Sequence, residues 1–171
     1  GYDRAAPQGV GSAKVAGNYA ADLMPNMAAK KAGFPIALYL DAKTHTLVEE
    51  FSTSNFLAID KKSGAYVTPI SDAILASITN KSLMQIAEDE GIEVQRRPVT
   101  IEEVMDGNFS EIAACGTAVV VTPVNKIVYM NRVAQISEGL EVGPVTRKLY
   151  NRVRGIQNGE AEDKFGWMIE V

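Results

Sequence analysis

One stretch decides the fold: Thr46-Leu-Val-Glu-Glu-Phe51-Ser-Thr-Ser-Asn55-Phe-Leu-Ala-Ile59. Apolar and β-branched residues run through residues 46–51 and 55–59, and small polar residues separate the two runs, which predicts two consecutive strands. A polar turn at residues 41–45 precedes them, and the turn Lys61-Lys-Ser-Gly64 follows them. We therefore expect this stretch to supply two strands of a sheet.

Strands and helices alternate unevenly on both sides of this stretch. Further strands are predicted at residues 34–40, 65–68, 93–97, 111–114, 119–121 and 126–129. Helices are predicted at residues 19–31, 77–90, 101–106 and 143–157, and Thr100 with Glu103 forms a capping-box pattern before the third. No repeat or interior linker interrupts the pattern. The sequence therefore predicts one mixed α+β (α/β) domain over residues 1–171.

The composition excludes several classes of function. The chain has 171 residues, 46% of them hydrophobic, and a formal net charge of −4. One cysteine and one histidine exclude a disulfide framework and a multi-cysteine or His-rich metal centre. An acidic chain lacks the basic face that nucleic acids need, and no apolar run approaches the ~20 residues that span a bilayer. We expect no metal, no nucleic-acid partner, no membrane and no signal peptide, and a cytoplasmic location.

Two positions could carry reactive charge. Lys14 is a lone cation in Gly11-Ser-Ala-Lys14-Val-Ala-Gly17-Asn-Tyr19, where a desolvated amine could attack a carbonyl carbon. A solvated surface lysine is the alternative. Glu49 and Glu50 are adjacent in a predicted strand, so their side chains face opposite ways. One could point inward and pair with a cationic ring nitrogen while the other is solvated, and an exposed hairpin that solvates both fits the pattern equally well.

Two further segments could bind an anion. Ser77-Ile78-Thr79 opens a predicted helix, where free amides and a hydroxyl suit a phosphate. Cys115-Gly116-Thr117-Ala118 lies between two predicted strands and could present the same groups. Ordinary capping and turn roles remain open for both. His45 is expected to be exposed, Cys115 to be a small buried residue and Trp167 to serve packing, with no catalytic role for any of them.

The order of these groups along the chain narrows the chemistry. A lysine comes first, then a glutamate, then a helix-start hydroxyl and a Gly-Thr turn. A pyridoxal phosphate site needs an amine for the aldehyde, a carboxylate for the ring nitrogen and anion-binding turns for the phosphate. The order therefore favours a site of that kind.

The same segments resemble the C-terminal, cofactor-binding domain of branched-chain amino acid aminotransferases, which are fold-type-IV pyridoxal phosphate enzymes. The resemblance rests on six segments in order, which are Tyr2-Asp-Arg-Ala-Ala-Pro7 with Ala13-Lys14-Val-Ala-Gly17-Asn18-Tyr19, Glu50-Phe-Ser-Thr53-Ser-Asn55, Ile74-Leu-Ala-Ser-Ile78-Thr79, Cys115-Gly116-Thr117-Ala118, Val142-Gly-Pro-Val-Thr146 and Gln157-Asn-Gly-Glu160. It covers essentially the whole chain. It implies the large domain of that fold, with a mixed sheet or pseudo-barrel and flanking helices.

The resemblance also implies roles for individual residues. Lys14 would form the Schiff base with pyridoxal 5'-phosphate and shuttle the substrate α-proton. Tyr19 would hydrogen-bond the phenolic oxygen of the cofactor, and Glu50 would pair with its pyridine nitrogen. The phosphate would be held by Ile78, Thr79 and Thr117, and the substrate carboxylate by Thr53 and Ala118. The implied reaction is transamination of leucine, isoleucine and valine with 2-oxoglutarate, giving branched 2-oxo acids and glutamate.

Two features depart from the family pattern. Ala76-Ser77 stands in place of Pro-Gly at the helix start. No segment matches the family's N-terminal small domain, so the resemblance implies a cofactor-binding fragment that is inactive or weakly active alone. A D-amino acid aminotransferase, an aminodeoxychorismate lyase of the same fold, and a non-catalytic fragment that binds pyridoxal phosphate remain alternatives. Because members of the family are dimers, we also expect a homodimer.

Overall fold

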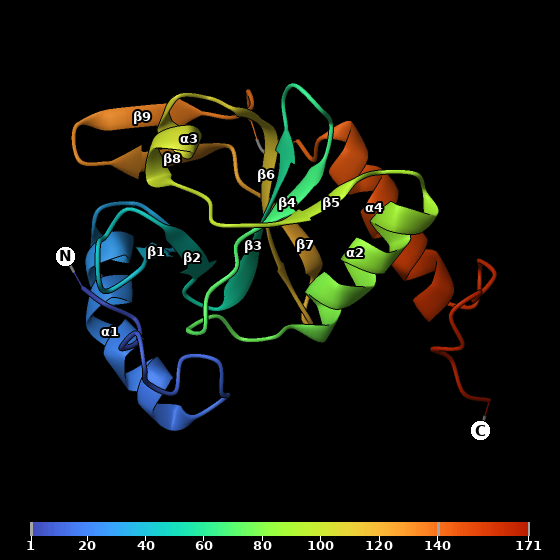
Figure 1. Ribbon diagram of the computed structural model, residues 1–171, viewed down its shortest axis with the longest axis horizontal. Helices are drawn as coiled ribbons and strands as arrows, with labels where there is room; N and C mark the ends of the chain where they lie inside the picture. The colour runs from blue at the N-terminus through green and yellow to red at the C-terminus, as the bar shows by residue number, and fades with distance from the viewer. Residues whose placement is uncertain (1, 140, 171) are drawn as a thin grey trace.

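A computed structural model describes residues 2–139 and 141–170, and strand β3 (Ser54–Asp60) is the element around which the others are arranged (Figure 1). On one edge, β3 pairs with β2 (Val48–Phe51) near its start and with β4 (Tyr66–Thr68) near its end. On the other edge it pairs along its length with β6 (Phe109–Gly116), which continues to β7 (Val120–Pro123). β1 (Leu38–Leu40) extends the β2 edge, and β5 (Val94–Arg96) pairs in parallel with β4. These seven strands form one mixed sheet.

The two faces of β3 are covered by different elements. Leu57 and Ile59 face a cluster that includes the buried sides of α2 (Ile78–Asp89) and α4 (Pro144–Gln157). Phe56 and Ala58 face a second cluster, to which α3 (Ile101–Met105) and the separate hairpin of β8 (Lys126–Tyr129) and β9 (Arg132–Gln135) contribute. Because neighbouring residues of a strand point to opposite faces, a strand buried on both faces shows continuous apolar residues rather than alternation. Residues 56–59 have that pattern.

The predicted elements are present, with changes at their ends. The capping box is confirmed, because the Thr100 hydroxyl accepts from the Glu103 amide and the Glu103 carboxylate accepts from the Thr100 amide. The first helix, α1 (Ala16–Lys31), begins three residues earlier than predicted. The run at residues 34–40 is a strand only from Leu38, since Pro35 has no amide to donate and β2 ends opposite Leu38 at Phe51. Strand β9 was not predicted, because only Ala134 of its four residues is buried.

The mixed sheet is confirmed, and within the described residues it does not close into a barrel. β1 and β5 end the main path of the sheet, and the β8–β9 hairpin is a separate two-stranded sheet. The short strands instead pair with both edges of β3. The turn that joins β2 to β3 and the turn that joins β6 to β7 therefore lie at the same end of the sheet.

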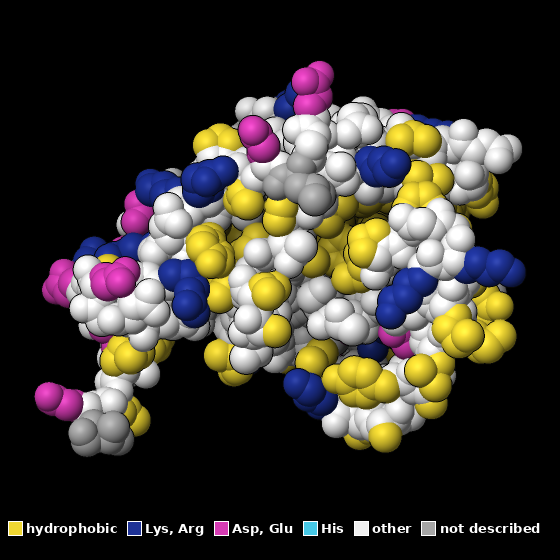
Figure 2. Space-filling view, turned by 180° about the vertical axis from the view of Figure 1, so that it is seen from behind, with side chains coloured by type: hydrophobic (Ala, Val, Ile, Leu, Met, Phe, Trp, Pro, Cys, Tyr) yellow, Lys and Arg dark blue, Asp and Glu magenta, His cyan; other side chains and the backbone are white. Residues whose placement is uncertain are grey.

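Helix α1 has an unusual distribution of polarity. Its buried residues are Asp22 and Pro25, whereas Leu23, Met24 and Met27 are exposed. Hydrophobic side chains accordingly gather on the outer surface of this helix (Figure 2). Asp22 accepts a hydrogen bond from the Tyr39 hydroxyl, which attaches the helix to β1, and a second one from the Asn26 side-chain amide within the helix. Among the described residues, no helix is both long and apolar enough to cross a membrane.

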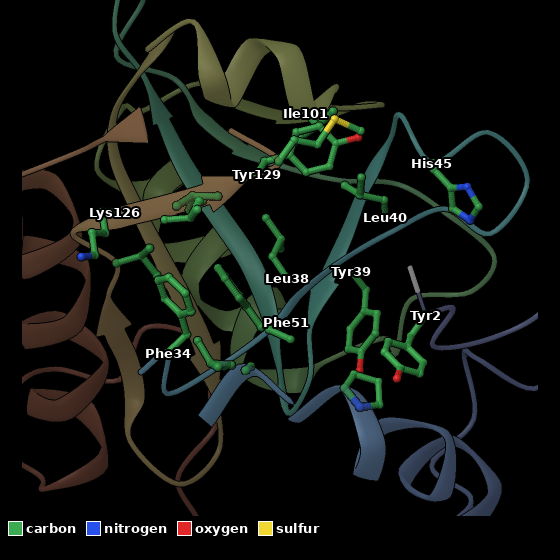
Figure 3. A pocket seen from close by; sticks show the side chains of 18 residues that line it. Tyr2, Phe34, Leu38, Tyr39, Leu40, His45, Phe51, Ile101, Lys126 and Tyr129 are labelled. Carbon is green, nitrogen blue, oxygen red and sulfur yellow. The ribbon is translucent and has the colours of Figure 1, made fainter. Parts of the chain in front are cut away.

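A largely apolar cavity of about 580 Å³ lies between α1, β1 and the β8–β9 hairpin (Figure 3). Its walls include Phe34, Leu38, Phe51 and Tyr129, and its one lysine is Lys126. Among the residues that the structure describes, no carboxylate, serine or threonine lines it. This cavity therefore lacks the groups that the sequence analysis associated with chemistry.

Candidate active site

The predicted site residues converge on a different cleft, of about 470 Å³, at the end of the sheet where the two hairpins turn. Seven of the eight line this cleft: Lys14, Tyr19, Glu50, Thr53, Ile78, Thr117 and Ala118. The eighth, Thr79, lies in the first turn of α2 beside Ile78 and is not part of the cleft wall. A cavity of a few hundred Å³ is of ordinary size for a small-molecule site. Residues up to 104 positions apart in sequence therefore share one wall.

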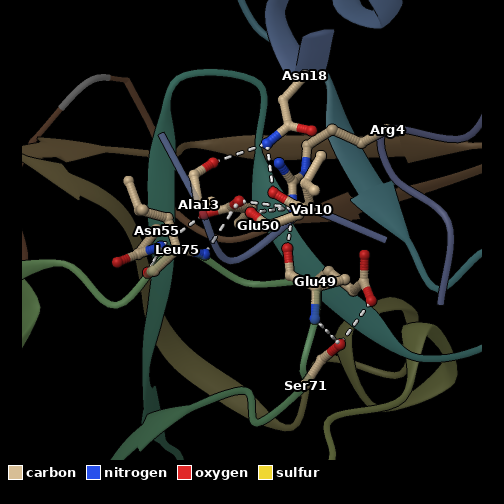
Figure 4. Close-up of polar contacts among 11 residues, drawn as sticks. Arg4, Val10, Ala13, Asn18, Glu49, Glu50, Asn55, Ser71 and Leu75 are labelled. Carbon is tan, nitrogen blue, oxygen red and sulfur yellow. Dashed lines mark hydrogen bonds and ion pairs between the residues drawn. The ribbon is translucent and has the colours of Figure 1, made fainter. Parts of the chain in front are cut away.

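The segment that carries Lys14 is held against the start of α1. The Asn18 side-chain amide donates to the carbonyls of Val10 and Ala13, at 2.9 and 2.8 Å (Figure 4). These two bonds fold the loop back on the helix and place Lys14 and Tyr19 on the same cleft. Both side chains are exposed in the cleft. Asn18 had no role in the sequence analysis beyond membership of the quoted motif.

Glu50 is the buried carboxylate of the cleft. Its side chain is 7% exposed, and both of its oxygens are engaged. Oε1 forms an ion pair with the Arg4 guanidinium at 2.9 Å, and Oε2 accepts from the Asn55 amide at 2.6 Å (Figure 4). Asn55 stands directly opposite Glu50 in the β2–β3 pairing, which explains the spacing of five residues between them. The orientation of the carboxylate is therefore fixed by its neighbours.

Burial dominates the electrostatics at Glu50. Loss of solvent raises the pKa of its carboxyl from an ordinary 4.5 to about 7, although Arg4, the Leu75 amide and Asn55 all act to lower it. The neighbouring Glu49 adds a small effect that raises this pKa. A carboxyl group with a pKa near neutrality responds strongly to a cation placed beside it. Glu50 is thus suited to pair with a cationic ring nitrogen.

Glu49 corrects one expectation. The two glutamates do face opposite ways, but neither is solvated, because Glu49 is only 4% exposed. Its carboxylate accepts from the Ser71 hydroxyl at 2.7 Å. The segment that contains Ser71 crosses this face of β2 and excludes water from it. The exposed hairpin that the alternation left open is therefore wrong.

The two segments that the sequence analysis predicted to bind an anion lie at the rim of the cleft. Ser77 caps α2 by accepting from the Asn80 amide, so the amides of Ile78 and Thr79 precede the first intrahelical bonds. Thr117 and Ala118 occupy the exposed turn between β6 and β7. Cys115 and Gly116 belong to β6 rather than to the turn, and Gly116 lies beside Ser54, where its missing side chain leaves the two hairpins close together. Two groups of amide and hydroxyl donors thus border one opening.

The remaining candidates behave as expected. His45 is exposed and pairs with Asp3, and Trp167 stacks on Phe165 with ring centroids 4.3 Å apart. Cys115 is fully buried, and this burial raises the pKa of its thiol to about 12. It is therefore a protonated packing residue at neutral pH. Among the described residues, no group of three His, Cys, Asp or Glu side chains could hold a metal ion.

Arg4 is the functional neighbour that sequence reasoning missed. It stood in a quoted motif, Tyr2-Asp-Arg-Ala-Ala-Pro7, but received no role. Its burial depends on Glu50 and on the backbone carbonyls of Gly11 and Ala73, and the contacts with Glu50 and Ala73 join segments far apart in the sequence, which no local pattern reveals. An arginine in a Gly- and Ala-rich loop is ordinarily exposed.

Comparison with known proteins agrees with this geometry. Residues 2–127 match the family described as amino-transferase class IV, and the chain belongs to that family. It is 45% identical to the branched-chain-amino-acid aminotransferase of Haemophilus influenzae, over 99% of this chain and 50% of that protein. It is 41% identical to the corresponding enzyme of Helicobacter pylori, over 99% of this chain and 48% of that protein. The chain thus spans about half the length of the curated relatives it matches.

Solved structures show the same relationship. The branched-chain amino acid aminotransferase from Escherichia coli superposes with a TM-score of 0.83 at 30% identity, over 97% of this chain and 53% of that one. The enzyme from Thermobaculum terrenum, in its PLP form, gives a TM-score of 0.78 at 27% identity, over 94% of this chain and 50% of that one. The expected fold-type-IV architecture is therefore confirmed.

Proposed function

We propose that this chain forms the cofactor-binding half of a pyridoxal phosphate-dependent aminotransferase for branched-chain L-amino acids, with 2-oxoglutarate as the second substrate. The observation that carries the proposal is the convergence of a lysine, a buried carboxylate and two amide-rich turns on one cleft. The names of the relatives supply the substrate class. Because the chain spans about half the length of those relatives, we expect a second domain to complete the pocket.

The residues present fit the cofactor. The side-chain carbonyl oxygen of Asn55, Oδ1, is buried and has no hydrogen-bond partner among the described residues, while the side-chain NH₂ donates to Glu50 and to the Leu75 carbonyl. An acceptor left open in a polar cleft is costly unless something donates to it. The cleft also offers donors for a phosphate at its rim and a carboxylate within it. Glu50 would hold the ring nitrogen, Tyr19 the phenolic oxygen, and Ile78, Thr79 and Thr117 the phosphate.

The remaining roles follow from position. When bound, pyridoxal phosphate supplies an electron sink for the substrate α-carbon. Lys14 would bind the cofactor through its amine, and this amine, once released, would remove the substrate α-proton and deliver it to the exocyclic carbon of the cofactor. Glu50 would keep the ring nitrogen cationic from the buried end. Thr53 and Ala118, from the two adjacent hairpin turns, would orient the substrate carboxylate between them.

The first test is chemical trapping. The purified chain is mixed with pyridoxal phosphate, reduced with borohydride and mapped by peptide mass spectrometry. We expect one adduct, on Lys14, that is lost in Lys14→Arg and kept in the matched surface variant Lys31→Arg. Adducts spread over surface lysines, or no adduct, would refute assembly of the site by this chain.

A substrate panel tests the reaction class. Turnover of L-leucine with 2-oxoglutarate by this chain is expected to be far below that of a longer relative, because a second domain is needed to complete the pocket. Preference for D-alanine, or conversion of aminodeoxychorismate, would instead favour the two other enzymes of this fold. The assay is formation of glutamate or of the 2-oxo acid.

We also propose that the protein forms a homodimer. The exposed apolar side chains of α1, among them Leu23, Met24 and Met27, support burial of that helix in an assembly. Sedimentation velocity should show a dimer that Leu23→Glu dissociates. A monomer at all concentrations would contradict the proposal.

A further inference from the structure

Arg4 is the one basic side chain among the buried residues of the described chain. It is 7% exposed and lies in the loop that precedes the Lys14 segment. Burial of a guanidinium is costly unless it is paired and hydrogen-bonded. Its contacts therefore show what the fold uses it for.

Those contacts join three parts of the candidate site. Arg4 Nη2 forms the ion pair with Glu50 Oε1 at 2.9 Å, on strand β2. The same nitrogen donates to the Ala73 carbonyl, which precedes the start of α2, and lies 3.4 Å from the Gly11 carbonyl, which precedes Lys14. One side chain therefore touches the carboxylate, the lysine loop and the segment that leads to the phosphate turn, and Figure 4 shows it beside Glu50.

The backbone is built around this arrangement. A Cβ atom at Gly11 would lie 2.5 Å from the Ala73 carbonyl oxygen, closer than such atoms ever approach. Glycine at this position lets the Lys14 loop lie directly against the segment before α2. Both carbonyls can then face the same guanidinium.

We propose that Arg4 is a positioning residue that keeps Glu50 ionised and oriented toward the cofactor ring, and that fastens the Lys14 loop to the segment before α2. This inference rests on the proposed function, because it assigns Arg4 a task in that same site. Arg4 itself contacts Glu50 and backbone carbonyls, and it acts through them.

The charges around Glu50 make Arg4 the decisive partner. Burial raises the pKa of Glu50, and Arg4 is the strongest of the influences that lower it. The other nearby titratable groups are Glu49, which raises this pKa, and Cys115, which is protonated at neutral pH. Without Arg4, the Glu50 carboxyl would be neutral at physiological pH, and a neutral carboxyl does not hold a ring nitrogen as a cation.

The test is a titration of Glu50 in the chain without cofactor, by NMR of ¹³C-labelled glutamate carboxyls, with the Glu50 signal assigned by its absence in Glu50→Gln. An opposite charge at this range lowers a carboxyl pKa by about 1–3 units. We therefore expect Arg4→Met to raise the midpoint by at least about one pH unit, a tenfold change in proton affinity. Arg4→Lys, which keeps the charge, should restore most of it.

A matched control separates a positioning role from a structural one. Ser71→Ala removes the hydrogen bonds of this hydroxyl to the Glu49 carboxylate and from the Ala73 amide but keeps the Arg4–Glu50 ion pair, so it should lower thermal stability and move the Glu50 midpoint far less than Arg4→Met does. An unchanged midpoint in folded Arg4→Met would overturn the proposal. If Arg4→Met does not fold, Arg4→Lys becomes the test. A Glu50 midpoint raised by a full pH unit in Arg4→Lys would overturn the proposal, because the retained positive charge would then fail to keep Glu50 ionised.

A second readout concerns the lysine loop. Borohydride trapping at Lys14 should fall about tenfold in Arg4→Met and recover in Arg4→Lys. Equal trapping in wild type and Arg4→Met would overturn the fastening role. The titration needs no cofactor, so failure of trapping in the wild-type chain would refute the proposed function and leave the coupling of Arg4 to Glu50 separately measured.

Discussion

Glu50 should make the stability of this protein fall as the pH rises toward neutrality. Its pKa is about 7 in the folded chain and an ordinary 4.5 when the chain unfolds. A group with a raised folded-state pKa stabilises the fold fully below its unfolded pKa, and this contribution is lost as the pH rises through the folded pKa. Glu50→Gln removes the titration and keeps the shape of the side chain.

The magnitude follows from these two pKa values. Each pH unit between them changes the free energy of unfolding by about 1.4 kcal/mol. The wild-type chain should therefore lose roughly 3 kcal/mol between pH 4.5 and pH 7. The carboxyls whose pKa is lowered, such as Asp41 at about 2, contribute below this window and with the opposite sign. Glu50→Gln should be nearly flat across it.

Urea unfolding at half-unit pH steps provides the assay. Fluorescence of Trp167, the chain's only tryptophan, reports tertiary packing against Phe165, and far-UV circular dichroism checks that the transition is two-state. Glu160→Gln, at an exposed position, is the control and should follow the wild-type slope. Parallel profiles for wild type and Glu50→Gln would refute the assignment of this pH dependence to Glu50.

Three further substitutions test local packing, the last of them at the candidate site. Gly143→Ala would place a methyl group on the Glu111 carboxylate, which accepts from the first amides of α4, and thermal unfolding should show a loss of about 2–4 kcal/mol; wild-type stability would contradict this. Met130→Asn should stabilise the β8–β9 turn by about 0.5–1 kcal/mol, because Met130 is exposed at φ 52°, and a lower melting temperature would count against the reasoning. Gly11→Ala should reduce borohydride trapping at Lys14 through about 2 kcal/mol of strain. Gly17→Ala should not, because a Cβ atom at Gly17 would meet open space. Equal trapping in the two variants would contradict this prediction.

Local features of this fold could be predicted from the sequence. The Thr100–Glu103 capping box needs only four residues, and both of its hydrogen bonds are present. Glu50 and Asn55 belong to one quoted motif, and a short hairpin places them opposite each other. Each of these is specified by neighbours in the chain.

Features that depend on distant segments could not be predicted in this way. Glu49 is buried because Ser71, 22 residues away, crosses its face of the sheet. Arg4 is buried because Ala73, 69 residues away, accepts from it. Alternation along a strand shows which residues share a face, but it does not show what covers that face.

The polarity of α1 has a consequence for motion. The helix buries little apolar surface, and its attachment relies on Asp22 and Pro25, whereas β3 is enclosed on both faces. Local unfolding requires least free energy where apolar burial is smallest. Amide hydrogens of α1 should therefore exchange with deuterium long before those of β3. The candidate site is then divided between a rigid wall that carries Glu50 and a labile one that carries Tyr19, and a ligand touching both would slow exchange in the helix far more than in the sheet.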